Sequence, residues 1–170
     1  MTDHGTPAPD PVSHPMTAVP NLGLTQLAQI IGYTATTEVL DRMAHRGYPG
    51  FRIHHGFLLQ HLITSGKTIG ELTTLMHITQ QAVSKNVTEL EKLGYVERLR
   101  DPDDARLRRV TLTPTGSAAM KTADQARAEV EHEITQHCGE DHVENARQTL
   151  LHVIDAMGGI NTVAERKIRH

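Results

Sequence analysis

Residues 68–93 read Thr68-Ile-Gly-Glu-Leu-Thr-Thr-Leu-Met-His-Ile-Thr-Gln-Gln-Ala-Val-Ser-Lys-Asn-Val-Thr-Glu-Leu-Glu-Lys-Leu93, and they predict two short helices. Thr68 and Glu71, three residues apart, form a capping box, in which the hydroxyl accepts from a first-turn amide and the carboxylate reaches back to the cap. Thr79 is a second N-cap, only a few residues after the first helix ends near Met76. Helices spaced so closely should cross steeply, as in a helix-turn-helix.

The second predicted helix has an apolar face and a polar face. Val83, Val87 and Leu90 recur at helical spacing and, with Ala82 and Leu93 beside them, should face a core. Amides, hydroxyls and an ammonium group on the opposite face can bond base edges or phosphates. These candidate DNA contacts, with the two capping threonines, are Thr68, Thr79, Gln80, Gln81, Ser84, Lys85 and Thr88. An ordinary solvated helix surface is the alternative interpretation.

A basic hairpin is predicted after this helix. Gly94 ends the helix, residues 95–100 alternate like a strand, residues 101–104 form a turn, and residues 106–113 form a second strand. Arg106, Arg108 and Arg109 of this hairpin suit a minor groove or phosphates, because narrow grooves attract guanidinium groups. A helix-turn-helix followed by such a hairpin predicts a winged helix.

Two segments, residues 83–98 and 101–116, resemble the MarR (multiple antibiotic resistance regulator) family of transcription factors. The second has the family's Asp-x-Arg pattern followed by Val-x-Leu-Thr-x-x-Gly, here Asp104, Arg106, Val110, Leu112, Thr113 and Gly116. The resemblance covers residues 22–157 approximately. It implies a homodimer that places its recognition helices in successive major grooves of double-stranded DNA, at a pseudo-palindromic operator. It also implies that Arg106 probes the minor groove and that Asp104 holds this arginine in position.

The composition of the 170-residue chain fits one domain with a helical core. Hydrophobic residues make up 38% and aromatic residues 3% of the chain, which favours a core of aliphatic side chains. No apolar run approaches the ~20 residues of a membrane span. The N-terminus lacks the apolar segment of a signal peptide, and the single cysteine gives no disulfide framework. These features predict a cytoplasmic protein with no membrane partner.

The formal net charge of −3 argues at first sight against a nucleic-acid partner. Residues 66–116, however, contain eight lysines and arginines against seven acids. We expect several of these acids to cap, pair or point away from DNA, among them Glu71, Glu89, Glu91, Asp101 and Asp104. So small a positive bias predicts a modest salt dependence, with specific contacts supplying much of the affinity.

Helices on both sides of the winged helix predict a dimer. Residues 22–46 and 51–63 should form two helices before it, and residues 114–137 and 141–157 two helices after it. The first helix and the last two have apolar faces that must be buried elsewhere, which a two-fold interface achieves. The predicted regions are a disordered tail (1–20), the winged helix with its dimerisation helices (21–157, DNA-binding module about 50–116) and a C-terminal tail (158–170).

Twelve histidines and Cys138 raise the alternative of a metal- or redox-responsive regulator of the same fold. Imidazole and thiolate suit zinc, copper or nickel. The spacing gives no H-x-x-x-H pair on a helix and no second cysteine, so we predict no metal site and no other cofactor. Solvated or capping histidines and an unreactive Cys138 are the simpler interpretation.

An effector site is implied by the resemblance, because many family members bind aromatic or phenolic compounds between the dimer helices and the winged module. Tyr48, Arg52, His54 and His55 would lie near that cleft and could bond a phenolate or carboxylate. Packing and turn roles are equally compatible with these residues.

The leading functional prediction is a homodimeric repressor relieved by a small ligand. An enzyme is the second hypothesis, but the sequence contains none of the usual catalytic or nucleotide-binding motifs. A protein-binding winged helix is the third, and the polar recognition face and wing arginines disfavour it. We therefore predict a mainly helical fold with a β-hairpin wing, a DNA partner and no enzymatic activity.

Overall fold

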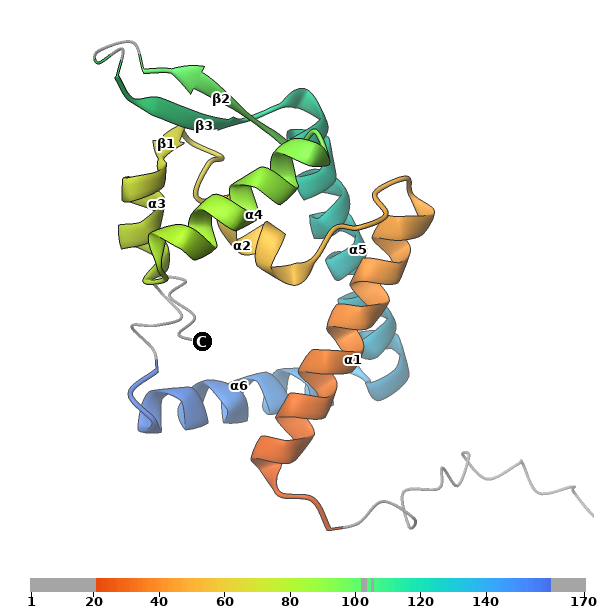
Figure 1. Ribbon diagram of the computed structural model, residues 1–170. Helices are drawn as coiled ribbons and strands as arrows, with labels where there is room; N and C mark the ends of the chain where they lie inside the picture. Colours follow the sequence, from red (N-terminus) through yellow and green to blue (C-terminus); the bar gives the residue numbers. More distant parts are fainter. Residues whose placement is uncertain (1–20, 102–103, 105, 160–170) are drawn as a thin grey trace, which may run out of the picture. The chain divides into compact units, whose positions relative to one another are not determined.

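The computed structural model describes residues 21–101, 104 and 106–159, which form helices and a small antiparallel sheet (Figure 1). In chain order, the elements are α1 (Leu24–His45), α2 (Ile53–Gln60), β1 (Lys67–Thr68), α3 (Ile69–Met76), α4 (Gln80–Lys92), β2 (Val96–Arg100), β3 (Arg108–Leu112), α5 (Pro114–Cys138) and α6 (Glu140–Ala156). The fold is therefore mainly helical with a β-wing, as predicted. The tail predicted at 1–20 and residues 160–170 of the C-terminal tail lie outside the described residues.

Two units divide the chain, one ending at Thr34 and the other beginning at Ala35. The first unit contains the N-terminal turns of α1, whose large apolar side chains are exposed: Leu24, Leu27, Ile30, Ile31 and Tyr33. The second unit contains the winged helix, α5 and α6. None of the helices in the described part of the chain is both long and apolar enough to cross a membrane.

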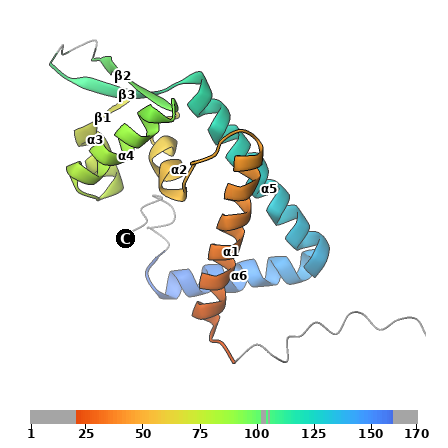
Figure 2. The same ribbon diagram turned by 45° about the vertical axis from the view of Figure 1, so that its right-hand side comes forward.

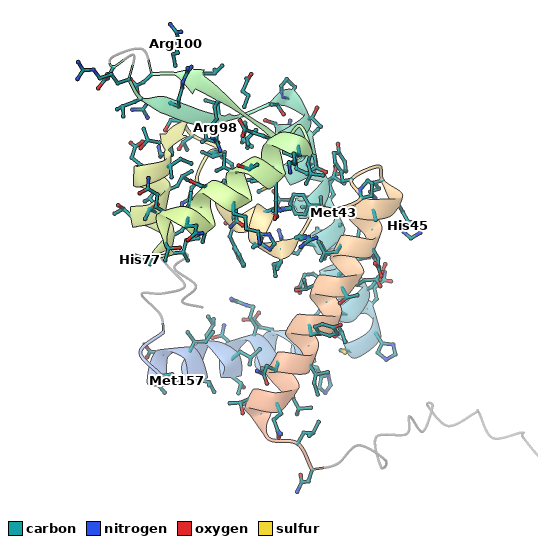
Figure 3. The ribbon with its side chains drawn as sticks, in the orientation of Figure 1. Met43, His45, His77, Arg98, Arg100 and Met157 are labelled. Carbon is teal, nitrogen blue, oxygen red and sulfur yellow. The ribbon has the colours of Figure 1, made fainter. Side chains whose placement is uncertain are left out.

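The helix-turn-helix forms as the caps predict. Thr68 Oγ1 accepts from Glu71 N at 3.1 Å, while Glu71 Oε2 accepts from Thr68 N at 2.7 Å, which confirms the capping box of α3. Thr79 Oγ1 caps α4 by accepting from Ala82 N at 3.2 Å. Between the helices, His77 takes a left-handed conformation (φ 54°), which ends α3 and turns the chain (Figure 3).

The sheet has three antiparallel strands in the order β1-β3-β2, of which β1 precedes α3 and the other two follow α4. Its register places Arg98 opposite Val110 and Arg100 opposite Arg108. β1 was not predicted from the sequence. Its second residue, Thr68, was predicted only as a helix N-cap, and it is both the end of β1 and the N-cap of α3. Thus the sheet is joined directly to the first helix of the helix-turn-helix.

The hairpin strands are shorter than predicted. β2 begins at Val96 because Tyr95 N still donates to Leu90 O, at 2.9 Å, where α4 ends. β3 begins at Arg108 rather than at residue 106, because Leu107 N donates to Asp104 O at 2.9 Å in the turn.

The helix predicted at 51–63 is also shorter. Arg52 is extended, and after Gln60 the chain continues in tighter turns, with Leu62 N donating to Leu59 O at 3.0 Å. Leu58 and Leu59 are fully buried, whereas Phe57 is half-buried.

One hydrophobic core joins α2, α3, α4, the sheet and the start of α5. Val83, Val87 and Leu90 are 0% exposed, which confirms the apolar face predicted for α4. Burial of each such side chain stabilises the fold by about 1.5–3 kcal/mol. The other core members are Met43, Phe51, Leu58, Leu59, Leu62, Leu72, Tyr95, Val96, Val110, Ala119, Met120 and Ala123.

The start of α5 is fixed against the end of α4. Thr113 Oγ1 accepts from Gly116 N at 3.0 Å, and Pro114 occupies the first turn, which confirms the predicted helix start. The same hydroxyl donates to Gly94 O at 2.6 Å, and Thr113 N donates to Tyr95 O at 3.1 Å. Figure 2 shows α5 leading from β3 to α6.

The capping box gives the first testable prediction. The hydrogen bond from Thr68 N lowers the pKa of Glu71 below its ordinary value of 4.5. A carboxylate with a lowered folded-state pKa stabilises the fold above its unfolded-state pKa, and this stabilisation is lost as pH falls through the folded value. Glu71→Gln should therefore be less stable than the wild type near neutral pH, and the difference should shrink as pH falls below 4.5. Urea unfolding across this range tests it, and a difference that stays constant with pH would contradict it.

Candidate nucleic-acid interface

The exposed face of α4 consists of short or flexible polar side chains. Gln80, Gln81 and Lys85 are exposed and Ser84 is half-buried. Thr88, another predicted contact, is engaged within the chain, because its hydroxyl donates to Ser84 O at 2.9 Å and accepts from Arg98 Nη2 at 3.3 Å. Together these side chains can donate and accept hydrogen bonds, and Lys85 gives the face one positive charge.

The acids of α4 are directed to partners within the chain. Glu89 Oε2 lies 3.4 Å from His55 Nε2 of α2. Glu91 Oε2 lies 3.2 Å from Arg98 Nε of β2. The hydrogen bond from His55 lowers the pKa of Glu89, so this carboxylate stays ionised while it is paired. This arrangement confirms the expectation that acids of the module pair.

The wing brings two arginines face to face on neighbouring strands. Arg100 of β2 and Arg108 of β3 are directly opposite and exposed. Directly opposed side chains lie on the same face of a sheet, where like charges are destabilising. The repulsion between the two guanidinium groups would be relieved if an anionic partner bound to both.

Arg98 and Arg100 were missed as site residues, although both lie in the predicted strand. Figure 3 shows Arg98 between the sheet and α4 and Arg100 farther along β2. The signal available in the sequence was their i, i+2 spacing, which places both on one face of the strand. Arg98 orients Glu91 and Thr88, so we describe it as a positioning residue of the α4 surface.

Asp104 and Arg106 lie together in the wing turn. Asp104 Oδ1 accepts from Arg106 N at 2.9 Å, and Asp104 N donates to Asp101 Oδ1 at 3.2 Å. Asp104 thus bonds the backbone of Arg106, whereas the family resemblance implied only that it holds the arginine. Both residues are exposed.

Arg109 has an internal role that the sequence did not indicate. Its Nε donates to Asp101 Oδ2 at 2.5 Å, and its Nη1 donates to Gly66 O at 2.9 Å and lies 3.5 Å from Glu71 Oε2. Asp101 is only 5% exposed, so this pair is largely desolvated. Arg109 therefore connects the wing to the segment around α3, and we do not propose it as a DNA contact.

The four residues predicted to bind an effector lie along a row of packed rings. The Tyr48 ring lies 6.2 Å from Tyr95, Phe51 lies 5.9 Å from Tyr95, and Phe51 lies 6.0 Å from His55, between centroids. His54 and the buried His55 are directed to Glu89. Arg52 is the exposed N-cap residue of α2. Effector binding by these residues stays a prediction.

The sequence profile of the MarR family matches residues 51–107, which contain α2, the helix-turn-helix and β2. This segment of the chain is therefore similar to the MarR family. The HTH-type transcriptional regulator TcaR of Staphylococcus aureus (strain Newman) is 31% identical over 85 residues, which are 49% of this chain and 56% of TcaR. The chain therefore spans about half the length of the curated relatives it matches.

Solved MarR structures share the fold. Wild-type E. coli MarR in its apo form matches with a TM-score of 0.59 and 21% identity, covering 78% of this chain and 98% of that one. A cysteine-to-serine mutant of E. coli MarR, complexed with operator DNA, matches with the same TM-score and identity over 77% of this chain and 93% of that one. These likenesses confirm the predicted winged-helix fold with flanking helices.

Proposed function

We propose that this chain is a homodimeric, sequence-specific DNA-binding regulator of the MarR type that acts as a repressor released by a small ligand. The DNA-binding module comprises about residues 50–116, with α4 as the recognition helix and the β2–β3 hairpin as the wing. The proposed contacts are Thr68, Thr79, Gln80, Gln81, Ser84, Lys85 and Thr88 around the helix-turn-helix, and Arg106 and Arg108, joined by Arg100, in the wing.

The distribution of charge on the module carries this proposal. Glu71 caps α3, Glu89 and Glu91 pair with His55 and Arg98, and Asp101 pairs with Arg109. Carboxylates held in this way are turned toward internal partners. Lysine and arginine side chains consequently dominate the solvent-facing surface, although residues 66–116 have a net charge of only +1. Positive surface charge facing phosphates is the usual source of DNA affinity.

Exposed apolar side chains support a homodimer. α6 has no buried residue, and its face includes Leu150, 36% exposed, while Met157 just beyond it is 75% exposed (Figure 3). The N-terminal turns of α1 separately expose Leu24, Ile30 and Ile31. Apolar helix faces of this kind fit a two-fold interface between copies of the chain.

The row of rings favours an aromatic or phenolic effector. Tyr48 is half-buried beside Tyr95, and Arg52 is an exposed cation close by in the sequence. A planar phenol with a carboxylate group complements a ring surface with a guanidinium group at its edge. His54 and His55 would lie at the other end of the same row.

Arg106→Ala tests the DNA-binding proposal. Selection of duplexes from a random pool should enrich an inverted repeat with half-sites about 10 base pairs apart. On the selected duplex, Arg106→Ala should weaken binding about tenfold or more and reduce the salt dependence by about one released counterion. Fluorescence anisotropy at several salt concentrations measures both effects.

Arg127→Ala is the matched control, because Arg127 is an exposed arginine on α5 paired only with Asp124 among the described residues. It should leave both affinity and salt dependence close to the wild type. Failure of a folded, dimeric protein to enrich any duplex would overturn the proposal.

A further inference from the structure

Two consecutive histidines of α2 meet a carboxylate of α4. His55 Nε2 lies 3.4 Å and His54 Nε2 lies 3.8 Å from Glu89 Oε2. One ligand atom from each of the three residues lies within 4.8 Å of the other two. Neighbouring positions on a helix point about 100° apart, so the convergence of both rings on one oxygen requires the packing of α2 on α4.

We propose that His54, His55 and Glu89 bind one divalent transition-metal ion of the zinc type. Two imidazole nitrogens and a carboxylate oxygen suit this class of ion, with water in the open position. Metal–ligand bonds of about 2.0–2.1 Å place neighbouring atoms of a tetrahedral ion about 3.3 Å apart. The separations of 3.4 and 3.8 Å from Glu89 Oε2 are within about half an ångström of this value. The two imidazole nitrogens lie within 4.8 Å of each other and have to approach by up to about 1.5 Å when the ion binds.

The site combines one buried ligand with two accessible ones. His55 is 1% exposed, so the packing of α2 on α4 holds its ring in place. His54 and Glu89 are each about one-third exposed, which gives an ion a route from solvent.

One hydrogen bond must rearrange when the ion binds. His55 Nδ1 accepts from Arg52 N at 3.2 Å, so the neutral ring carries its proton on Nε2, toward Glu89. A metal on Nε2 displaces that proton, which the ring can take up on Nδ1, and Arg52 N then turns to water. Because loss of an outer hydrogen bond typically weakens a metal site about 10- to 100-fold, we expect micromolar affinity.

Cobalt binding to the full chain tests the site without any DNA. The wild type should bind one equivalent of Co²⁺ with a visible d–d spectrum of nitrogen and oxygen ligands, and added Zn²⁺ should displace it. His54→Ala and Glu89→Gln should each weaken binding about tenfold or more. Circular dichroism verifies that both variants are folded, which their partial exposure favours.

His152→Ala is the matched control, because His152 is an exposed histidine on α6. It should bind Co²⁺ as the wild type does. Absence of a one-to-one complex at micromolar Co²⁺, or a complex that both His54→Ala and Glu89→Gln retain, would overturn the proposal.

Occupancy should also strengthen DNA binding, a consequence that rests on the proposed function. The ion neutralises Glu89 one helical turn from Lys85, which raises the positive potential of α4. Zn²⁺ should tighten binding of the wild type to the selected duplex, and Glu89→Gln should bind tightly without responding to it. If Co²⁺ binds but Zn²⁺ leaves DNA affinity unchanged, the predicted effect of the metal on DNA binding is wrong, while the metal site itself is supported. If no duplex is bound, the proposed function fails separately.

Discussion

Gly116→Ala is expected to lower the free energy of unfolding by about 3 kcal/mol or more, although it adds only one methyl group. A Cβ at this position would lie 2.0 Å from Tyr95 O and 2.9 Å from Tyr95 C. These are backbone atoms, so no side-chain rotation relieves the clash. Tyr95 O is also held in place as the acceptor of Thr113 N. The start of α5 would have to move away from the end of α4 by about an ångström, which breaks the contacts of Thr113.

Gly70→Ala is the matched control for this prediction. Gly70 lies in α3, and the nearest atom to an added Cβ, Thr68 Oγ1, is 3.9 Å away. Alanine is favoured over glycine in a helix by about 1 kcal/mol, so this variant should be as stable as the wild type or more so. Urea unfolding compares the two variants. Wild-type stability of Gly116→Ala would mean that α5 does not hold its observed position against Tyr95.

Arg109→Ala is expected to be the second large effect, lowering the free energy of unfolding by about 2–4 kcal/mol. The substitution leaves Asp101, whose side chain is 3% exposed, as a buried carboxylate without its guanidinium partner. It also removes the donor to Gly66 O, which connects β3 to the segment before β1. One-third exposure of the Arg109 side chain keeps the effect below that of a fully buried pair. Arg109→Lys should recover only part of it, because an ammonium group cannot span both acceptors.

Two comparisons make this prediction specific. Arg108→Ala removes the neighbouring, exposed arginine and should change stability by no more than about 0.5 kcal/mol. The double variant Asp101→Ala with Arg109→Ala should lose less than the two single losses combined, because neither charge is then left alone. Strictly additive losses, measured by urea unfolding, would show that the pair does not act as a unit.

The elements that the sequence predicted well are those fixed by local chemistry. Thr68, Thr79 and Thr113 each sit at a helix start, and all three hydroxyls make the expected cap contacts. The apolar stripe of α4 likewise follows from spacing alone. The ends of helices and strands were less predictable where contacts outside the element decide them. β3, for example, begins only at Arg108, because Leu107 N donates a hydrogen bond to Asp104 O in the turn.

Side-chain roles that depend on distant residues could not be obtained from spacing. Arg109 resembles its neighbours Arg106 and Arg108 in the sequence, yet only Arg109 meets Asp101, Gly66 and Glu71. His54 and His55 likewise contain no recognisable ligand motif by themselves. Their third partner, Glu89, lies 34 residues from His55 and reaches it only because α2 packs on α4.

Because Thr113 joins the start of α5 rigidly to the wing, a small tilt of α5 at Thr113 moves the far end of the helix by a larger distance. With 25 residues and a rise of about 1.5 Å per residue, this helix is about 36 Å long. A tilt of about 6° at Thr113 would therefore displace its far end by about 4 Å. Conversely, a displacement of several ångströms at Cys138 corresponds to a rotation of only a few degrees at the hairpin.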